Sequence, residues 1–345
     1  MVKELRERTQ AGMGDCKAAL VEAGGDIEKA IEVILKKGIV KAASRAGKVA
    51  AEGAVRTALS ADKRRGVIVE VNCQTDFVAI GEDFKGLVSK VIEAAQNAKA
   101  GADLNAEKAG DKTIDELRQS FIAKSGENVV VRRWAALDAK EPGGLLHEYI
   151  HMGGKLAVLI HAEAPTAEAA KSKEVLEFIE NVAMQIAAMN PLVVSRDQVD
   201  AASVEKQKEI FTAQLKEENV QFESDAKQLE EEAAAVARGE KPDGDKTPDA
   251  AWFASQISGL RKKQKPEASF PKIIEGKVNK WLSEASLLGQ ENVWNPADGS
   301  IDKIRGEISK KVGGDLKFHG FVRFGLGEGI EKKTDNLADE VAKLM

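Results

Sequence analysis

One order of secondary structure occurs twice in this sequence, and it constrains the fold more than any other feature. Residues 54–96 predict a strand, a charged turn, a second strand and a helix, and residues 145–189 repeat that order. The second strand of the first copy, Gly66 to Val71, reads GVIVEV and is β-branched and largely apolar. A Gly-Gly pair forms the turn of the second copy, and Pro191 follows its helix. We therefore predict an α+β fold with two related core subdomains.

A short helical segment precedes the first copy. Residues 1–38 predict three helices, with Asp15 expected to cap the second, Asp26 to cap the third and Gly38 to end it. A bundle this small buries little apolar surface, and such domains usually bind a partner. Residues 39–53 are rich in Ala, Lys and Gly, so we interpret them as a linker with some helical tendency.

Residues 201–263 predict a helical hairpin. The apolar residues from Phe222 to Val236 are spaced alternately four and three apart, which is the heptad spacing of a coiled coil. A loop with two prolines at residues 239–249 separates this helix from the next. An exposed seam of this kind favours self-association or packing on a neighbour, so a homodimer formed through residues 201–263 is one prediction.

The remaining boundaries follow from these segments. The first core subdomain is predicted at residues 54–140, and the second at residues 141–200 and 264–330 on either side of the hairpin. Residues 318–329, FHGFVRFGLGEG, predict a strand that ends in glycine-rich turns. A last helix is predicted in residues 331–345.

Composition and charge argue against several classes of protein. A net charge of −5 gives no general reason to expect a nucleic-acid partner, although the run RKKQK is basic. The two cysteines lack CxxC spacing, which argues against a disulfide framework or a zinc knuckle. The longest apolar runs fall far short of the ~20 residues that a membrane span needs. The N-terminus is charged from its third residue, unlike a secretory signal. We expect a cytoplasmic protein with no membrane contact.

The sequence offers no convincing catalytic constellation. His147 and His151 are four residues apart, but they lie on a predicted strand and turn, and no HExxH motif completes a metal set. The glycines near the C-terminus match neither GxGxxG nor GxxxxGK[ST] and predict turns. Cys73 is expected to be a small buried thiol rather than a nucleophile. We therefore expect no enzyme activity, no catalytic residue, no metal site and no cofactor, and we favour a binding protein.

The stretch Cys73 to Val78, CQTDFV, follows the apolar strand of the first copy. Asp76 at this place can cap the next helix while Phe77 fills a core. The same two residues can form a probe held out toward a partner, since a rigid strand behind a probe lowers the entropy lost on binding. Spacing alone leaves both interpretations open.

Three stretches resemble the elongation factor Ts family of bacterial protein biosynthesis: LRERTQAGMGDCKAAL (5–20), VNCQTDFVAIGEDF (71–84) and FVRFGLGEGIEK (321–332). The likeness covers nearly the whole chain. Its order of segments also resembles that family, with a three-helix head similar to ubiquitin-associated (UBA) domains, two related core subdomains, an inserted coiled-coil hairpin and a C-terminal helix. The resemblance implies a guanine-nucleotide exchange factor whose partner is the GTPase elongation factor Tu.

By this resemblance, Thr75, Asp76, Phe77 and Val78 form the element that intrudes on the GTPase. Phe77 would wedge into an apolar pocket near the magnesium site, and Asp76 would disturb the network that holds the ion. Magnesium neutralises phosphate charge, so its dislocation would release the nucleotide. Burial of a phenylalanine in a partner contributes roughly 2–3 kcal/mol, enough to drive the intrusion.

The same resemblance implies further partner contacts. Arg6 and Met13 match residues that contact the nucleotide domain, although Met13 taken alone would be assigned to the bundle core. His151 matches a histidine directed at the phosphate-binding loop, although a lone histidine more often makes a hydrogen bond at a strand end. The last helix, residues 334–345, matches one that docks on the partner.

The sequence departs from the family pattern in three places. Gly14 stands where a second methionine is common, and Ser125 stands where an apolar residue is common. The hairpin from about residue 219 to 263 is longer than in typical relatives, which leaves the stoichiometry open. Two other functions are also considered: a dimeric scaffold without exchange activity, and a thiol enzyme using Cys73 with a nearby histidine.

Overall fold

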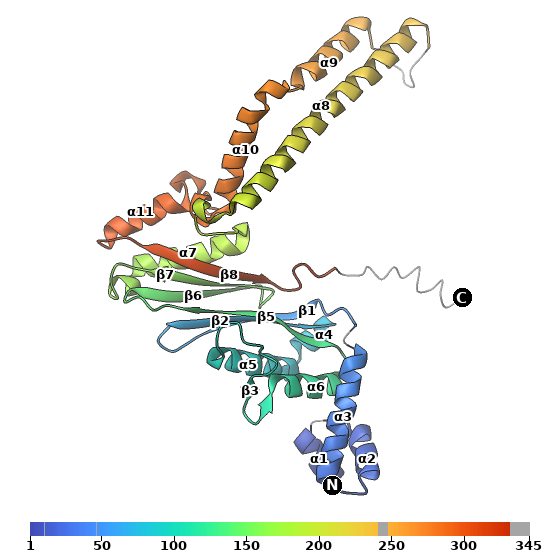
Figure 1. Cartoon of the computed structure of the whole chain (residues 1–345), viewed down its shortest axis with the longest axis vertical. Coiled ribbons are helices and arrows are strands. Elements are labelled where there is room, and N and C mark those ends of the chain that lie inside the picture. The colour runs from blue at the N-terminus through green and yellow to red at the C-terminus, as the bar shows by residue number, and fades with distance from the viewer. Residues whose placement is uncertain (10, 46, 241–247, 332–345) are drawn as a thin grey trace. The chain divides into compact units, whose positions relative to one another are not determined.

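The computed structural model describes the chain except for residues 10 and 46 and the segments 241–247 and 332–345 (Figure 1). The chain divides into two compact units. The sheet unit comprises residues 1–190 and 292–345, and the hairpin unit comprises residues 191–291. N-terminal helices, small antiparallel sheets and long helices occur together, so the predicted α+β class is confirmed.

The N-terminal bundle consists of α1 (Val2–Thr9), α2 (Met13–Glu22) and α3 (Ile27–Arg45). Its interior is a small apolar cluster that includes Leu5, Cys16 and Ala30, all fully buried.

Two of the helix ends predicted for this bundle are wrong. Asp15 does not cap α2, because that helix begins at Met13 and places Asp15 inside its first turn. The third helix does not end at Gly38 but continues to Arg45. A glycine inside a helix costs only about 1 kcal/mol relative to alanine, and helix-forming Ala and Lys residues follow it. The predicted cap at Asp26 is confirmed, since its Oδ1 accepts from the Lys29 N–H at 3.1 Å.

The first sheet contains the first copy of the repeated pattern. Its strands, antiparallel and in spatial order, are β1 (Glu52–Leu59), β2 (Arg65–Cys73) and β5 (Val129–Asp138). The helices of this part are α4 (Asp76–Ile80), α5 (Glu82–Asn97) and α6 (Ile114–Ser125), with a two-residue ribbon of β3 (Lys108–Ala109) and β4 (Lys112–Thr113). One face of β2 packs on α5 and α6 in a shared apolar cluster.

The second sheet contains the second copy. Its strands, antiparallel and in order, are β6 (Gly144–His151), β7 (Leu156–Glu163) and β8 (Lys317–Gly325). The remaining helices of the sheet unit are η1 (Ala169–Lys171), α7 (Lys173–Met189), η5 (Pro296–Asp298) and α11 (Ile301–Lys311). In both sheets a helix follows the hairpin, and a third strand pairs with the free edge of the second. The predicted repeat is therefore confirmed.

The two sheets share an apolar layer. Ile68 of β2 and Leu159 of β7 lie together in one buried cluster. Neighbouring Val67 and Val69 belong instead to the cluster with α5 and α6, because successive residues of a strand point to opposite faces. A Cβ atom on Gly66 would lie 2.8 Å from Leu159 Cδ1, so this glycine permits the close approach of the sheets. Burial on both faces explains why GVIVEV is almost continuously apolar.

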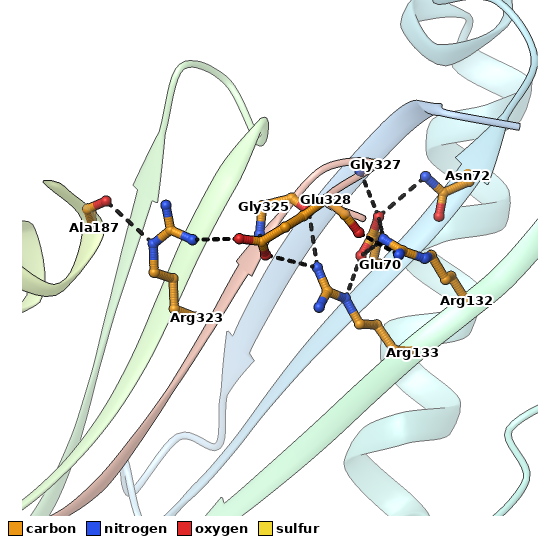
Figure 2. Close-up of polar contacts among 9 residues, drawn as sticks. All are labelled: Glu70, Asn72, Arg132, Arg133, Ala187, Arg323, Gly325, Gly327 and Glu328. Carbon is orange, nitrogen blue, oxygen red and sulfur yellow. Dashed lines mark hydrogen bonds and ion pairs between the residues drawn. The ribbon is translucent and has the colours of Figure 1, made fainter. Parts of the chain in front are cut away.

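Glu70 interrupts that apolar run, and its side chain is nevertheless fully buried. Its carboxylate accepts hydrogen bonds from Arg132 Nη1 at 2.9 and 3.1 Å, from Arg133 Nε at 2.5 Å and from the Gly327 N–H at 2.8 Å (Figure 2). Burial raises the pKa of Glu70, but the Gly327 N–H and the two guanidinium groups outweigh it, so the net pKa is lowered.

A β-bulge places both arginines opposite this carboxylate. Glu70 pairs with Arg133, whereas Val71 pairs with Val131, so Arg132 is the extra residue of β5. A bulge sets two residues against one, which lets two cations reach a single buried anion.

The glycine-rich end of β8 completes the Glu70 cluster. Gly327 has a φ of +68°, and the turn that it forms points its N–H at Glu70. Glu328 binds Arg133 at 3.3 Å and Arg323 at 3.2 Å and accepts from the Gly325 N–H (Figure 2). The predicted turn role of these glycines is confirmed, and the turn joins the second sheet to the first.

The hairpin unit contains α8 (Ala201–Ala237), α9 (Ala250–Lys263) and α10 (Phe270–Ala285), with η2 (Arg196–Gln198), η3 (Glu267–Ser269) and η4 (Leu287–Gly289). Asp200 caps α8 through the Ser203 N–H at 2.8 Å, and Asp249 caps α9 through the Trp252 N–H at 2.7 Å.

The heptad seam of α8 is not exposed as predicted. It packs along α9, with Ala226 fully buried and Phe222 partly buried. Arg261 of α9 binds Glu223 at 3.2 Å and Glu230 at 2.9 Å beside the seam. The seam was predicted as a free surface because a heptad pattern does not identify which helix covers it. Pairing of two copies through residues 201–263 stays a prediction.

The predicted last helix falls on residues 332–345, which lie outside the described part of the chain. Among the helices that are described, none is both long enough and apolar enough to cross a membrane.

We predict that Glu70→Gln lowers the free energy of unfolding at pH 7 by about 3 kcal/mol, since it removes the anion from a largely buried ionic cluster. Because folding lowers the pKa of Glu70 from its ordinary 4.5, the stabilisation is complete above that value and is lost as pH falls through the folded-state pKa. Wild type should therefore lose stability below about pH 4.5, and the variant should lose less of it over that range.

Urea unfolding at pH 7 and at pH 3.5 measures both effects. Glu93→Gln is the control, because Glu93 pairs with Lys90 on the exposed surface and should contribute no more than about 1 kcal/mol. Equal stabilities of the two variants would contradict the role given to Glu70.

Candidate functional site

The stretch CQTDFV lies where β2 leads into the short helix α4. Thr75 is the N-cap of α4, and its Oγ1 accepts from the Val78 N–H at 3.3 Å. Asp76 is an exposed residue of the first helical turn, where a carboxylate faces the positive end of the helix dipole. The interpretation in which Asp76 supplies the cap is therefore wrong.

Phe77 is also not part of a core. Its side chain is 83% exposed, and Ile80 of the same helix is 67% exposed. The opposite side of α4 carries Val78 and Ala79, which pack against the cluster under the first sheet. One short helix thus anchors itself by two small apolar residues and presents two larger ones to solvent. An apolar pair in this setting adds nothing to the packed interior and is typical of a docking surface.

Glu127 holds the start of α4 in place. Its Oε2 accepts from the Thr75 N–H at 3.1 Å, and its Oε1 accepts from the Thr75 hydroxyl at 2.7 Å. Glu127 stands between α6 and β5, after the left-handed cap Gly126, and its own N–H donates to Ser125 Oγ at 3.2 Å. Ser125 therefore helps to hold Glu127, which in turn positions Thr75.

Cys73 precedes this helix and is fully buried. Its thiol donates to the Thr75 carbonyl at 3.2 Å. Burial, together with the nearby Glu127 carboxylate, raises the pKa of Cys73 to about 12. Because the thiolate is the nucleophile, a thiol in this state is inert at neutral pH. The prediction of a buried structural thiol is confirmed, and the geometry does not support a thiol enzyme at Cys73.

The sequence model of the family described as "Elongation factor TS" matches residues 74–328. The chain is 42% identical over 346 residues to Elongation factor Ts of Clostridium perfringens strain SM101, with 99% of this chain and 97% of that protein covered. It is 40% identical over 353 residues to Elongation factor Ts of Clostridium tetani (100% and 98% covered) and 40% identical over 346 residues to that of Nitratiruptor (100% and 97% covered). The chain belongs to the elongation factor Ts family. It is therefore a member of a family of translation elongation factors.

The other residues expected from the family resemblance lie on the surface. Arg6 of α1 and Met13 of α2 are exposed, so assigning Met13 to the bundle core is wrong. Gly14 beside it has open space, since an added Cβ would meet no atom within 4 Å. His151 is exposed at the end of β6, where its Nδ1 lies 2.9 Å from the Tyr149 hydroxyl and the two rings stack.

The turn after His151 is joined to the first sheet. The Val55 N–H of β1 donates to the Gly154 carbonyl at 2.8 Å. Val55 lies three residues along β1 from Glu52, and Glu52 pairs with Cys73 at the end of β2. Among the described residues no hydrogen bond or ion pair is found between His151 and Thr75–Val78. Arg6 and Met13 lie on α1 and α2 of the N-terminal bundle.

Sequence reasoning missed Glu127. Its contact with Thr75 spans 52 residues and joins two chain segments that become neighbours only when β5 pairs with β2. The sequence signal that could have pointed to Glu127 was its place in the tripeptide Gly-Glu-Asn, which follows Ser125 and precedes β5.

We predict that Glu127→Ala loosens the first turn of α4 without unfolding the sheet, because the Thr75 amide and hydroxyl both lose their acceptor. Amide hydrogen exchange should become at least tenfold faster at Thr75 and Val78 and remain unchanged in α5. Glu82→Gln is the control, since Glu82 lies nearby but its carboxylate pairs with Lys85 on the exposed start of α5. Unchanged exchange at Thr75 in Glu127→Ala would show that α4 needs no such support.

Proposed function

We propose that this chain is a guanine-nucleotide exchange factor for elongation factor Tu, working in the cytoplasm, and that Thr75 to Val78 intrude near the magnesium site of that GTPase. The observation that carries the proposal is the exposure of Phe77, an aromatic side chain 83% open to solvent on a helix of fixed start. Membership of the elongation factor Ts family supports it.

Phe77 supplies the driving force for the intrusion. Moving its exposed ring into an apolar pocket of the partner removes that surface from water, which contributes about 2–3 kcal/mol. The start of α4 is already ordered by the two hydrogen bonds from Thr75 to Glu127, so little further conformational entropy is lost on binding.

Asp76 supplies the charge. Its carboxylate stands next to Phe77 in the first turn of α4 and is exposed, so it enters the partner site together with the ring. Magnesium requires near-ideal octahedral geometry and oxygen ligands. An anion brought beside this site competes for the hydrogen bonds of the network that holds the ion, and once the ion is displaced the phosphates of the nucleotide lose the charge that neutralised them.

Exchange by this route is a thermodynamic coupling. If the factor weakens nucleotide binding by a given ratio, the nucleotide weakens binding of the factor by the same ratio. The factor therefore forms its tightest complex with the empty GTPase and is displaced when fresh nucleotide and magnesium bind.

Three further surfaces are assigned to the same partner. Arg6 and Met13 project from α1 and α2, where an exposed cation and an exposed thioether suit contact with the nucleotide domain. His151, exposed beside Tyr149, is assigned to the phosphate-binding loop. The segment 334–345 is assigned to a docking helix.

We predict that Phe77→Ala slows stimulated GDP release from elongation factor Tu by roughly 30- to 150-fold, which corresponds to the loss of about 2–3 kcal/mol. The variant should unfold at the same temperature as wild type, because the ring contributes little to the interior. Release of a fluorescent GDP analogue at millimolar magnesium measures the rate, and calorimetry measures the unfolding temperature.

Trp294→Ala is the matched control, since Trp294 is another exposed aromatic of the sheet unit, at 61% exposure, and should leave release unchanged. Full activity of Phe77→Ala would remove Phe77 from the mechanism. If wild type itself gives no acceleration, the dimeric scaffold without exchange activity becomes the better explanation.

A further inference from the structure

Two histidines and two carboxylates gather at one end of the second sheet. His161 of β7 and His319 of β8 have ring centroids 4.6 Å apart. With Glu141, which precedes β6, each offers a ligand atom, and these atoms all lie within 4.8 Å of one another. It is the one such group of three found in the described part of the chain.

A β-bulge brings the histidines together. His161 pairs with Gly320, whereas Ala162 pairs with Phe318, so His319 is the extra residue of β8. In regular antiparallel pairing only one residue stands opposite His161, but the bulge sets both His319 and Gly320 there. Bulges re-aim side chains in this way, and they are often found at functional sites.

The two carboxylates close the cluster. Glu141 Oε2 lies 3.0 Å from His161 Nε2, and the Glu141 carbonyl accepts from the Gly144 N–H in the turn that leads into β6. Glu163 Oε2 lies 2.8 Å from His319 Nε2. The donors thus come from three chain segments that the sheet holds side by side.

We propose that Glu141, His161 and His319 bind a zinc ion, with Glu163 orienting His319. Two imidazoles and a carboxylate form a donor set that zinc uses in proteins, whereas magnesium and calcium prefer oxygen ligands alone. Carboxylates commonly orient histidines that bind a metal.

The spacing of the three donor atoms can be compared with that of a tetrahedral zinc site. Zinc–nitrogen and zinc–oxygen distances of about 2.0–2.1 Å place tetrahedral ligands about 3.4 Å apart. The donors, within 4.8 Å of one another, need a contraction of about 1.4 Å at most, and the side chains of His319 and Glu141 are partly exposed.

The zinc site is separate from the surface proposed for exchange. Gly144 pairs with Glu163 at the cluster end of the β6–β7 hairpin, whereas His151 pairs with Leu156 at the other end. The ion would tie the segment before β6 to β7 and β8, and it would stabilise this end of the sheet without touching α4.

Titration of the metal-stripped full chain with Zn²⁺ alone, followed by calorimetry, tests the proposal. Wild type should bind one equivalent of zinc with micromolar or tighter affinity and should melt at a higher temperature when saturated. His319→Asn and Glu141→Gln should each weaken binding at least tenfold. His147→Asn is the matched control, because His147 is a partly buried histidine of the same sheet that pairs with Glu180 outside the cluster.

Imidazole ¹H–¹⁵N spectra identify the ligands directly, since the chain has only four histidines. Zinc should shift the signals of His161 and His319 and leave those of His147 and His151 in place. Absence of binding by wild type at 100 µM zinc (roughly a hundredfold above a micromolar Kd) would overturn the proposal. Equal binding by His319→Asn and wild type, or loss of binding in His147→Asn alone, would also overturn it.

Discussion

The sheet unit depends on one buried anion. Glu70 lies in the central strand of the first sheet, fully buried, and its charge is tolerated there because Arg132, Arg133, the Gly327 N–H and the Asn72 amide donate to it. The arginines come from β5 and Gly327 from the turn after β8, so one carboxylate links the first sheet to the second. Three residues beyond it β2 ends at Cys73, and the candidate site begins. The strand that supports α4 is thus held by an ionic cluster as well as by apolar packing.

The same structural device is used in both sheets. Each pairing of the middle strand with the third strand has a bulge, at Glu70/Val71 in one and at His161/Ala162 in the other. In each case two residues of one strand stand opposite one residue of the other, which brings additional polar side chains to a single position of the sheet. In the first sheet the result is two arginines on one carboxylate. In the second it is a pair of histidines next to two carboxylates.

The intrusion proposed for α4 requires an apolar side chain that is left exposed to water in the free protein. Two sides of α4 differ in this respect. Val78 and Ala79 pack against the apolar cluster of the first sheet, while Phe77 and Ile80 are exposed to solvent. Glu127 then fixes the helix start from a different chain segment. Exposure of the ring and rigidity of its support are both needed, because a mobile ring would lose on binding much of the free energy that its burial supplies.

The sequence by itself determined the local elements: the repeated hairpin and helix, the cap at Asp26, the glycine turns after β8 and the hairpin of α8 and α9. The tertiary structure alone decided that Phe77 points to solvent, that α9 covers the seam of α8, and that Glu127 meets Thr75. It also decided which side chains pair with Glu70 and which lie beside His161. Local patterns follow from propensities and spacing along the chain. Pairings between distant strands depend on register and bulges, because these decide which side chains meet. No local pattern specifies register or bulges.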